Sequence, residues 1–99
     1  MGARGNEHAF ERGTIGGVTV GPTASTLLAA NVQRRYAALV NTGEVDEYLA
    51  LGTAAESGKG LCLKAGGGAF ELNAVNLFHG AVSAITATGT SLVTTQEGM

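Results

Sequence analysis

The chain alternates between short apolar runs and small breaks that are polar or rich in glycine. From residue 18 to residue 95 these runs recur about every ten residues, and each ends at a Gly, Asn or Asp signal. Short runs at such regular spacing are typical of antiparallel sandwiches and barrels. We therefore predict an all-β domain of about eight short strands, at residues 14–20, 24–29, 35–41, 47–51, 60–64, 69–73, 81–87 and 91–97.

The distribution of apolar residues also indicates how the strands are arranged. Residues 35–41 are apolar on both faces, which predicts a central strand, whereas Gly16-Gly17 suits a bulge or a sheet edge. We expect hairpins between strands 35–41 and 47–51, across residues 65–68 and across residues 88–90. Residues 53–59 are the one place for a helical turn, and residues 74–79 form a connection that closes the end of the core.

These elements predict a small antiparallel two-sheet sandwich, jelly-roll or Ig-like, with a partly closed β-barrel as the alternative. Cys62, the only cysteine, lies in an apolar alternation and is expected to be buried or half-buried, and it leaves no intramolecular disulfide. The side chains expected in the core are Leu39, Val40, Leu49, Leu51, Leu63, Leu72 and Ile85.

Residues 1–13 (MGARGNEHAFERG) differ from the rest of the chain and show no helical or strand period. One interpretation is a frayed terminus, and the other is an extended N-terminal arm that becomes ordered on a neighbouring subunit. Burial of Phe10, worth at most about 1.5–3 kcal/mol, cannot offset roughly 1–2 kcal/mol for ordering each residue of the arm. We therefore divide the chain into an arm, residues 1–13, and one sandwich domain, residues 14–99.

Composition favours assembly. Gly makes up 16 of 99 residues, and charged residues are 14% against about 25% in ordinary domains. Part of this weakly polar surface is expected to be buried in a homo-oligomer, a dimer or a trimer. Six basic and eight acidic side chains form no basic stripe, so a nucleic-acid partner is not expected. No apolar stretch reaches the roughly 18 residues that span a bilayer and no signal-type segment opens the chain, which predicts synthesis in the cytoplasm and no membrane partner.

The residues that usually carry chemistry are scattered. His8, His79 and Cys62 lack metal-ligand spacing, residues 52–60 fail the phosphate-loop pattern, and the acidic residues 44–47 lack the alternation of a calcium loop. We predict no catalytic, cofactor-binding or metal site, and no enzyme. Arg34-Arg35 precedes the most apolar strand, either as a solvated strand end or as a bidentate salt bridge to a partner's carboxylate. The interface candidates are Arg4, Phe10, Arg12, Arg34 and Arg35.

Five segments follow one another in an order that is also found in a known protein family. They are QRRYAALVNTG (residues 33–43), YLALG, GLCLKAGG (a strand and turn), FELN and GAVSAITATGTSLVTTQEG. Over roughly residues 26–98 the chain resembles a β-module found in small structural proteins of tailed bacteriophages. Members include capsid decoration (cement) proteins and parts of head fibres or spikes, which are oligomeric and not enzymes. The resemblance implies a virion protein on the capsid surface, with the major capsid protein as its partner. The alternative is a head-fibre, spike or tail attachment module, or a carbohydrate-binding sandwich.

Overall fold

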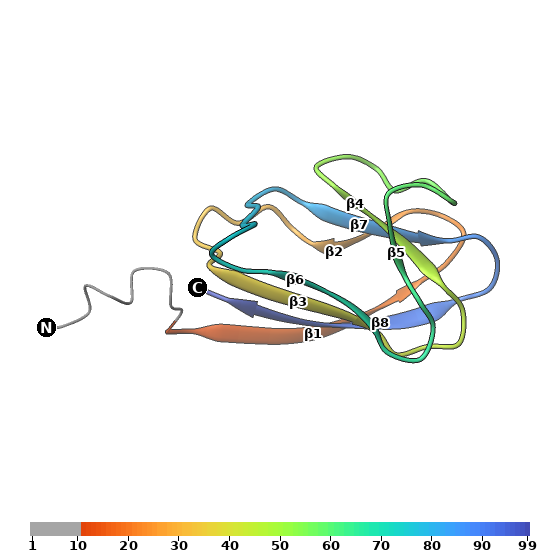
Figure 1. The fold of residues 1–99 in the computed structure, drawn as a ribbon, viewed down its shortest axis with the longest axis horizontal. Helices are drawn as coiled ribbons and strands as arrows, with labels where there is room; N and C mark the ends of the chain where they lie inside the picture. Colours follow the sequence, from red (N-terminus) through yellow and green to blue (C-terminus); the bar gives the residue numbers. More distant parts are fainter. Residues whose placement is uncertain (1–10) are drawn as a thin grey trace, which may run out of the picture.

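The computed structural model describes residues 11–99, which form eight strands in two layers (Figure 1). These residues contain no helix, so the predicted all-β class is confirmed, and each predicted strand overlaps one observed strand. Residues 53–59, the one place where a helical turn could form, contain only a single turn, in which the Lys59 amide donates to the Glu56 carbonyl at 3.1 Å. The strands are β1 (Gly13–Val20), β2 (Ser25–Leu28), β3 (Tyr36–Asn41), β4 (Glu47–Leu51), β5 (Leu61–Leu63), β6 (Gly68–Leu72), β7 (Val82–Thr86) and β8 (Ser91–Gly98).

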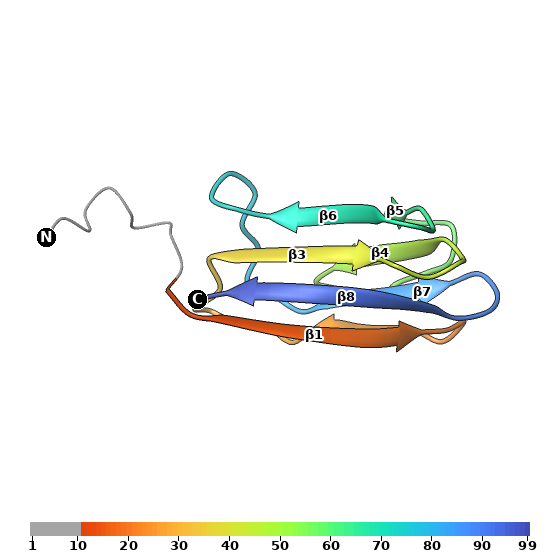
Figure 2. The same ribbon diagram turned by 90° about the horizontal axis from the view of Figure 1, so that it is seen from below.

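The strands pair antiparallel in two four-stranded sheets, with the orders β1-β8-β3-β6 and β2-β7-β4-β5. Figure 2 shows the first sheet from its outer side, with the second sheet behind it. Only β4 and β5 are consecutive strands that pair, and every other connection crosses between the sheets. Two sheets wound in this order form a jelly roll. The predicted sandwich is confirmed, while the barrel and the Ig-like arrangement are wrong, since Ig-like sheets contain several pairs of consecutive strands.

The three predicted hairpins are wrong for the same reason. β3 and β4, β5 and β6, and β7 and β8 lie in opposite sheets, so each of these connections is an arch across the end of the sandwich. The turn positions themselves are correct: Gly89 lies between β7 and β8 with a φ of 75°, a conformation that favours glycine. Glycine turns can serve an arch as well as a hairpin, so turn chemistry alone does not identify the partner strand.

The core lies between the sheets and is built from alternate residues of each strand. In β3 the side chains of Ala37, Leu39 and Asn41 point inward and are buried, whereas Tyr36, Ala38 and Val40 are half-buried on the outer side. β3 is central in its sheet, as predicted from its two apolar faces, and four of the leucines predicted to lie in the core are buried. Those four are Leu39, Leu49, Leu63 and Leu72.

Three other core expectations need correction. Val40 and Ile85 are only half-buried because they alternate with the inward residues of β3 and β7, and Leu51 packs against the core while partly exposed. Cys62 is exposed rather than buried, because Leu63 is the residue of β5 that faces inward. Apolar residues on both faces of a strand hide which face is the core.

β1 is an edge strand, as the two glycines suggested, but it contains no bulge, because its ladder with β8 runs without interruption from Gly13↔Gly98 to Val20↔Ser91. The backbone of Arg12 and Met99 exchanges two further hydrogen bonds of 2.8 and 3.1 Å. The last part of the expected arm, residues 11–13, is thus attached to β8. Residues 1–10, with the interface candidates Arg4 and Phe10, lie outside the described residues.

Candidate interaction surface

The outer side of the β1-β8-β3-β6 sheet is a weakly charged surface with exposed aliphatic side chains. Because β-strand side chains alternate, the residues that are not in the core line this outer side. Among them Glu71 alone is charged. We call this surface the groove face, and its residues are Ile15, Gly17 and Thr19 of β1, Leu92, Thr94 and Gln96 of β8, Tyr36, Ala38 and Val40 of β3, and Ala69 and Glu71 of β6.

A shallow groove of about 550 Å³ crosses this face between β1 and β3. Ile15 is 82% exposed at one side of the groove, and Leu92 is 43% exposed near the other end of β8. Exposed aliphatic side chains beside uncharged neighbours are a typical feature of a surface that another protein covers. The residues that line the groove are Ile15, Gly16, Ala38, Val40, Thr94, Thr95 and Gln96.

The one carboxylate on the groove face is held by hydrogen bonds. Tyr36 donates its hydroxyl to Glu71 Oε2 at 2.6 Å, and Asn73 Nδ2 donates to Glu71 Oε1 at 3.1 Å. These bonds lower the pKa of Glu71, and the bond to the carboxylate raises the pKa of Tyr36. The charge of Glu71 therefore stays at the β6 rim of the face, away from the groove.

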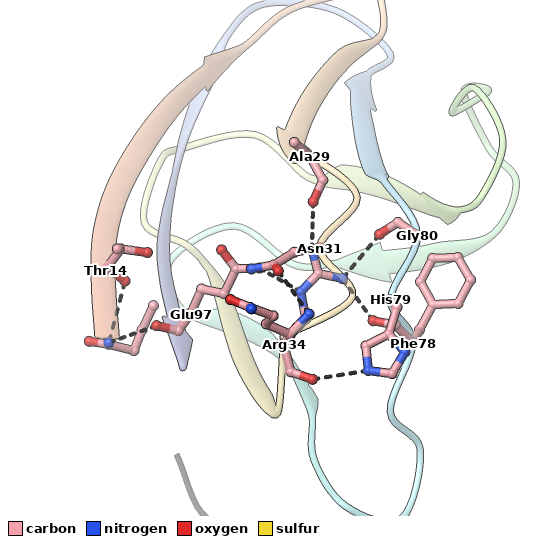
Figure 3. A network of polar contacts seen from close by, with 10 residues as sticks. Thr14, Ala29, Asn31, Arg34, Phe78, His79, Gly80 and Glu97 are labelled. Carbon is pink, nitrogen blue, oxygen red and sulfur yellow. Dashed lines mark hydrogen bonds and ion pairs between the residues drawn. The ribbon is translucent and has the colours of Figure 1, made fainter. Parts of the chain in front are cut away.

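Arg34 is not at the surface, contrary to the expectation of a solvated strand end. Its residue exposure is 1%, and its guanidinium is surrounded by acceptors of its own chain (Figure 3). Nε donates to Glu97 Oε2 at 2.6 Å, Nη1 to the carbonyls of Phe78 and Gly80 at 2.7 and 3.0 Å, and Nη2 to the Ala29 carbonyl at 2.7 Å. Its carboxylate partner is thus Glu97 of the same chain, and this arginine offers nothing to a partner.

Contacts of Asn31 and His79 add to those of Arg34. We call the whole network the internal clamp, and its residues are Ala29, Asn31, Arg34, Phe78, His79, Gly80 and Glu97. Asn31 Nδ2 donates to Glu97 Oε2 at 3.3 Å, and the Asn31 amide donates to the His79 carbonyl at 2.8 Å. His79 Nε2 lies 3.0 Å from the Arg34 carbonyl oxygen, which can only accept, so this nitrogen carries the proton. The clamp fastens the β2–β3 loop to the segment before β7 and to the end of β8.

The other described candidates, Arg12 and Arg35, are exposed at the same end of the sandwich. Arg12 Nη2 donates to Gln33 Oε1 at 3.3 Å, and the Arg35 amide donates to the Gly98 carbonyl at 2.8 Å. The structure therefore brings Arg12, Arg34 and Arg35 together around the end of β8. Arg12 and Arg35 are exposed to solvent, and Arg34 is buried inside the sandwich. The groove face lies beside this end and contains none of the residues that the sequence suggested as an interface.

The opposite end of the sandwich contains a second buried polar group, Glu47 at the start of β4. It is fully buried, and neither carboxylate oxygen has a hydrogen-bond partner. Burial raises the pKa of Glu47 to about 7, although the nearby Ser91 hydroxyl acts in the opposite direction. Ser91 Oγ donates its proton to Asn41 Oδ1 at 2.6 Å, so that proton is not given to Glu47.

Asn41 explains the Asn-Thr-Gly sequence at the end of β3. Its Nδ2 donates to the carbonyls of Val45 and Leu63 at 2.8 and 2.9 Å, which joins the β3–β4 arch to β5 in the other sheet. Gly43 is required because a Cβ at this position would overlap Ser91. Asn41 and Ser91 therefore stabilise the arch between β3 and β4.

Within residues 11–99 no group of three or more His, Cys, Asp or Glu side chains is arranged to hold a metal ion. The same residues include no helix that is long and apolar enough to cross a membrane. Comparison of the chain with family models, curated proteins and solved structures gives no match.

Proposed function

We propose that this protein is a virion structural protein, a capsid cement or decoration protein that binds the outside of a bacteriophage head and bridges neighbouring capsid subunits. Its partner in this proposal is the major capsid protein, and it acts as a homo-oligomer. The observation that carries the proposal is the groove face, a nearly uncharged sheet surface with exposed Ile15 and Leu92 on a chain of 99 residues. Such a surface suits contact with another protein more than contact with water.

Two further observations support it. The resemblance over residues 26–98 is to virion proteins of this kind, and eight-stranded jelly rolls recur in viral capsid domains and in lectins. The likeness to the jelly rolls of capsids and lectins concerns the fold alone, so it supports the proposal less strongly. A lectin function would require several exposed aromatic rings to stack on sugars. Among the described residues Phe70 and Phe78 pack against the core and Tyr36 bonds Glu71, which leaves Tyr48, half-buried on the other sheet.

The physical benefit of such a protein follows from where it binds. A capsid filled with DNA is under outward pressure, and a small domain that contacts two neighbouring subunits opposes their separation. Many weak contacts of this kind add together over a symmetric shell. A stable sandwich with one flat binding face and an internal clamp at its end is suited to this role.

A binding experiment with matched variants tests the proposal. Val40 of β3 and Ile85 of β7 are half-buried, β-branched and central in their sheets, but they lie on opposite outer sides of the molecule. We expect Val40→Lys to reduce co-sedimentation with empty heads at least tenfold, and Ile85→Lys to leave it unchanged. Circular dichroism and thermal melting of both variants show that each is folded.

The source of the heads is the virus whose major capsid protein gene neighbours the gene of this chain. Electron microscopy of decorated particles then separates the two virion functions, because a cement protein covers the whole shell whereas a fibre or spike module labels discrete positions. Absence of a capsid gene among the neighbouring reading frames, or no binding to the heads of a virus that has one there, would contradict the proposal.

A further inference from the structure

The free edge of β1 carries a regular row of backbone groups that β8 does not use. Arg12 and Met99 exchange both of their backbone hydrogen bonds, and the β1–β8 register continues from them without a break. Because hydrogen-bonded pairs alternate along an antiparallel ladder, every second residue of β1 bonds to β8, beginning with Thr14. The amide and carbonyl groups that point to the free edge, without a partner among the described residues, are those of Gly13, Ile15, Gly17 and Thr19.

The other three sheet edges have features that discourage pairing. β5 is three residues long, β2 has four residues and an irregular register between Thr26 and Leu28, and β6 has Glu71 on its free edge. Short strands, irregularities and charges are the usual ways in which proteins protect sheet edges. β1, by contrast, has eight residues, a regular ladder and no charged side chain.

The row on β1 is also complementary to itself. Its four residues are evenly spaced about Gly16, so a second β1 that runs antiparallel across a two-fold axis at Gly16 places each of them opposite another. Gly13 then faces Thr19, and Ile15 faces Gly17 of the second copy. The Ile15 side chain, 82% exposed in the single chain, covers a residue that has no side chain. An axis at Gly17 would instead leave Gly13 beyond the paired segment.

We propose that β1 pairs with β1 of a second copy, antiparallel about a two-fold axis through Gly16, to join the two β1-β8-β3-β6 sheets into one continuous sheet. No like charges meet across this contact, because β1 has none. Residues that face each other in an antiparallel pair lie on the same side of the sheet. The two groove faces therefore lie side by side on one surface of the dimer.

The size of the contact sets its strength. An eight-residue strand is about 27 Å long, and a strand edge of that length buries less than the roughly 800 Å² per partner of a standard interface. We therefore expect a weak dimer that forms in a concentration-dependent way. On a symmetric shell, a dimer with two groove faces would bind far more tightly than either copy alone.

This inference rests on the proposed function only for the expectation that the chain self-associates. Sedimentation equilibrium without capsids tests the pairing, whereas binding to heads tests the function, so failure of one is distinguishable from failure of the other. The measurements use a Cys62→Ser background, because Cys62 is exposed and would otherwise form disulfides between chains.

We expect the dimer fraction of the parent protein to rise reversibly as its concentration increases from micromolar to millimolar. Gly17→Pro removes a donor that β8 does not use, and we expect it to weaken the dimer at least tenfold. Ala69→Pro, on the free edge of β6, is the matched control and should leave the dimer unchanged. Ile15→Lys, at a position exposed enough to keep the fold, should weaken the dimer to a similar extent. A parent that is monomeric throughout, or variants that all dimerise like the parent, would overturn the proposal.

A disulfide trap tests the axis. Gly16 faces itself in a pair without hydrogen bonds, where Cα atoms lie about 4.5 Å apart, within the range of about 4.4–6.8 Å that a disulfide spans. Its φ is not in the left-handed region, and a Cβ there would lie 3.0 Å from Thr95 Oγ1, so the cysteine is accommodated by a shift of the Thr95 hydroxyl of a few tenths of an ångström. We expect Gly16→Cys to cross-link on oxidation much faster than Gly17→Cys. Faster cross-linking through Gly17→Cys would show that the axis is wrong.

Discussion

Glu47 links the stability of this protein to pH. A carboxyl group that is fully buried without a partner is more stable when protonated, and burial raises the pKa of Glu47 from 4.5 to about 7 in the folded chain. Stability from a raised pKa is complete below the unfolded value and is lost as pH rises through the folded value. The folded protein should therefore lose stability between about pH 4.5 and about pH 7.

Removing the charge tests this link. We expect Glu47→Gln to be more stable than the parent above pH 7 by about 3 kcal/mol, since each pKa unit corresponds to about 1.4 kcal/mol. The variant should also lack the decline in stability between pH 4.5 and 7. Urea denaturation at several pH values measures both effects. Glu44→Gln, an exposed carboxylate three residues earlier, is the control and should retain the parent's pH profile.

Arg34 is the most constrained side chain at the other end of the sandwich. Arg34→Ala would remove the Arg34 donors from the carbonyls of Ala29, Phe78 and Gly80 and would leave the Glu97 carboxylate with only the longer bond from Asn31. Removal of one partner from a buried ion pair costs about 3–5 kcal/mol, so the variant should be strongly destabilised in chemical denaturation. Arg35→Ala, at the exposed neighbouring position, should change stability by less than about 0.5 kcal/mol. Equal effects would show that the guanidinium contacts contribute little.

At the scale of the strands, the alternation of β3 determines which substitutions matter. Leu39 is fully buried, whereas Val40 lies on the groove face. We expect Leu39→Ala to cost about 2–5 kcal/mol and to lower the melting temperature clearly. Val40→Ala should cost under about 1.5 kcal/mol, because its side chain is only half-buried. A larger effect at Val40 than at Leu39 would mean that the face assignment of β3 is reversed.

The strands could be predicted from the sequence because each one ends at a local turn signal. Their pairing could not, because the Asn41–Glu47 connection contains the same turn residues whether it forms a hairpin or crosses to the other sheet. The outward position of Val40 was likewise hidden, since it is as apolar as the buried Leu39 beside it. Local chemistry sets where a strand ends, and long-range packing sets what it pairs with.

The candidate site was largely hidden for the same reason. Charge suggested the arginines as contacts, but the acceptors of Arg34 lie as many as 63 residues away in the chain, and only the fold brings them together. The groove face consists mainly of small and aliphatic residues and threonines from four strands, a combination with no signature in sequence. The low overall charge was the one signal that indicated such a surface.

At the scale of the whole molecule, the jelly-roll order distributes roles between two ends and two faces. The ion pair of Arg34 with Glu97 stabilises one end of the sandwich, and the hydrogen bond of Ser91 to Asn41 stabilises the other. The residues that line the groove take no part in these contacts. The polar groups that fix the fold are thus separated from the surface proposed to bind. Substitutions on the groove face should therefore weaken binding while leaving the protein folded, which is the premise of the Val40→Lys experiment.

The position of β8 has a consequence for how this chain is made. Of the eight described strands β8 is the last to leave the ribosome, yet it lies between β1 and β3, the first and third of them. Until it emerges, β1 has no partner and the interior of that sheet is open. Folding of this sheet must then wait until β8 has emerged and proceed through distant contacts, which are slow to form. During that interval the uncharged β1 is exposed along both edges, and protection of the nascent chain by a chaperone would matter most at this stage.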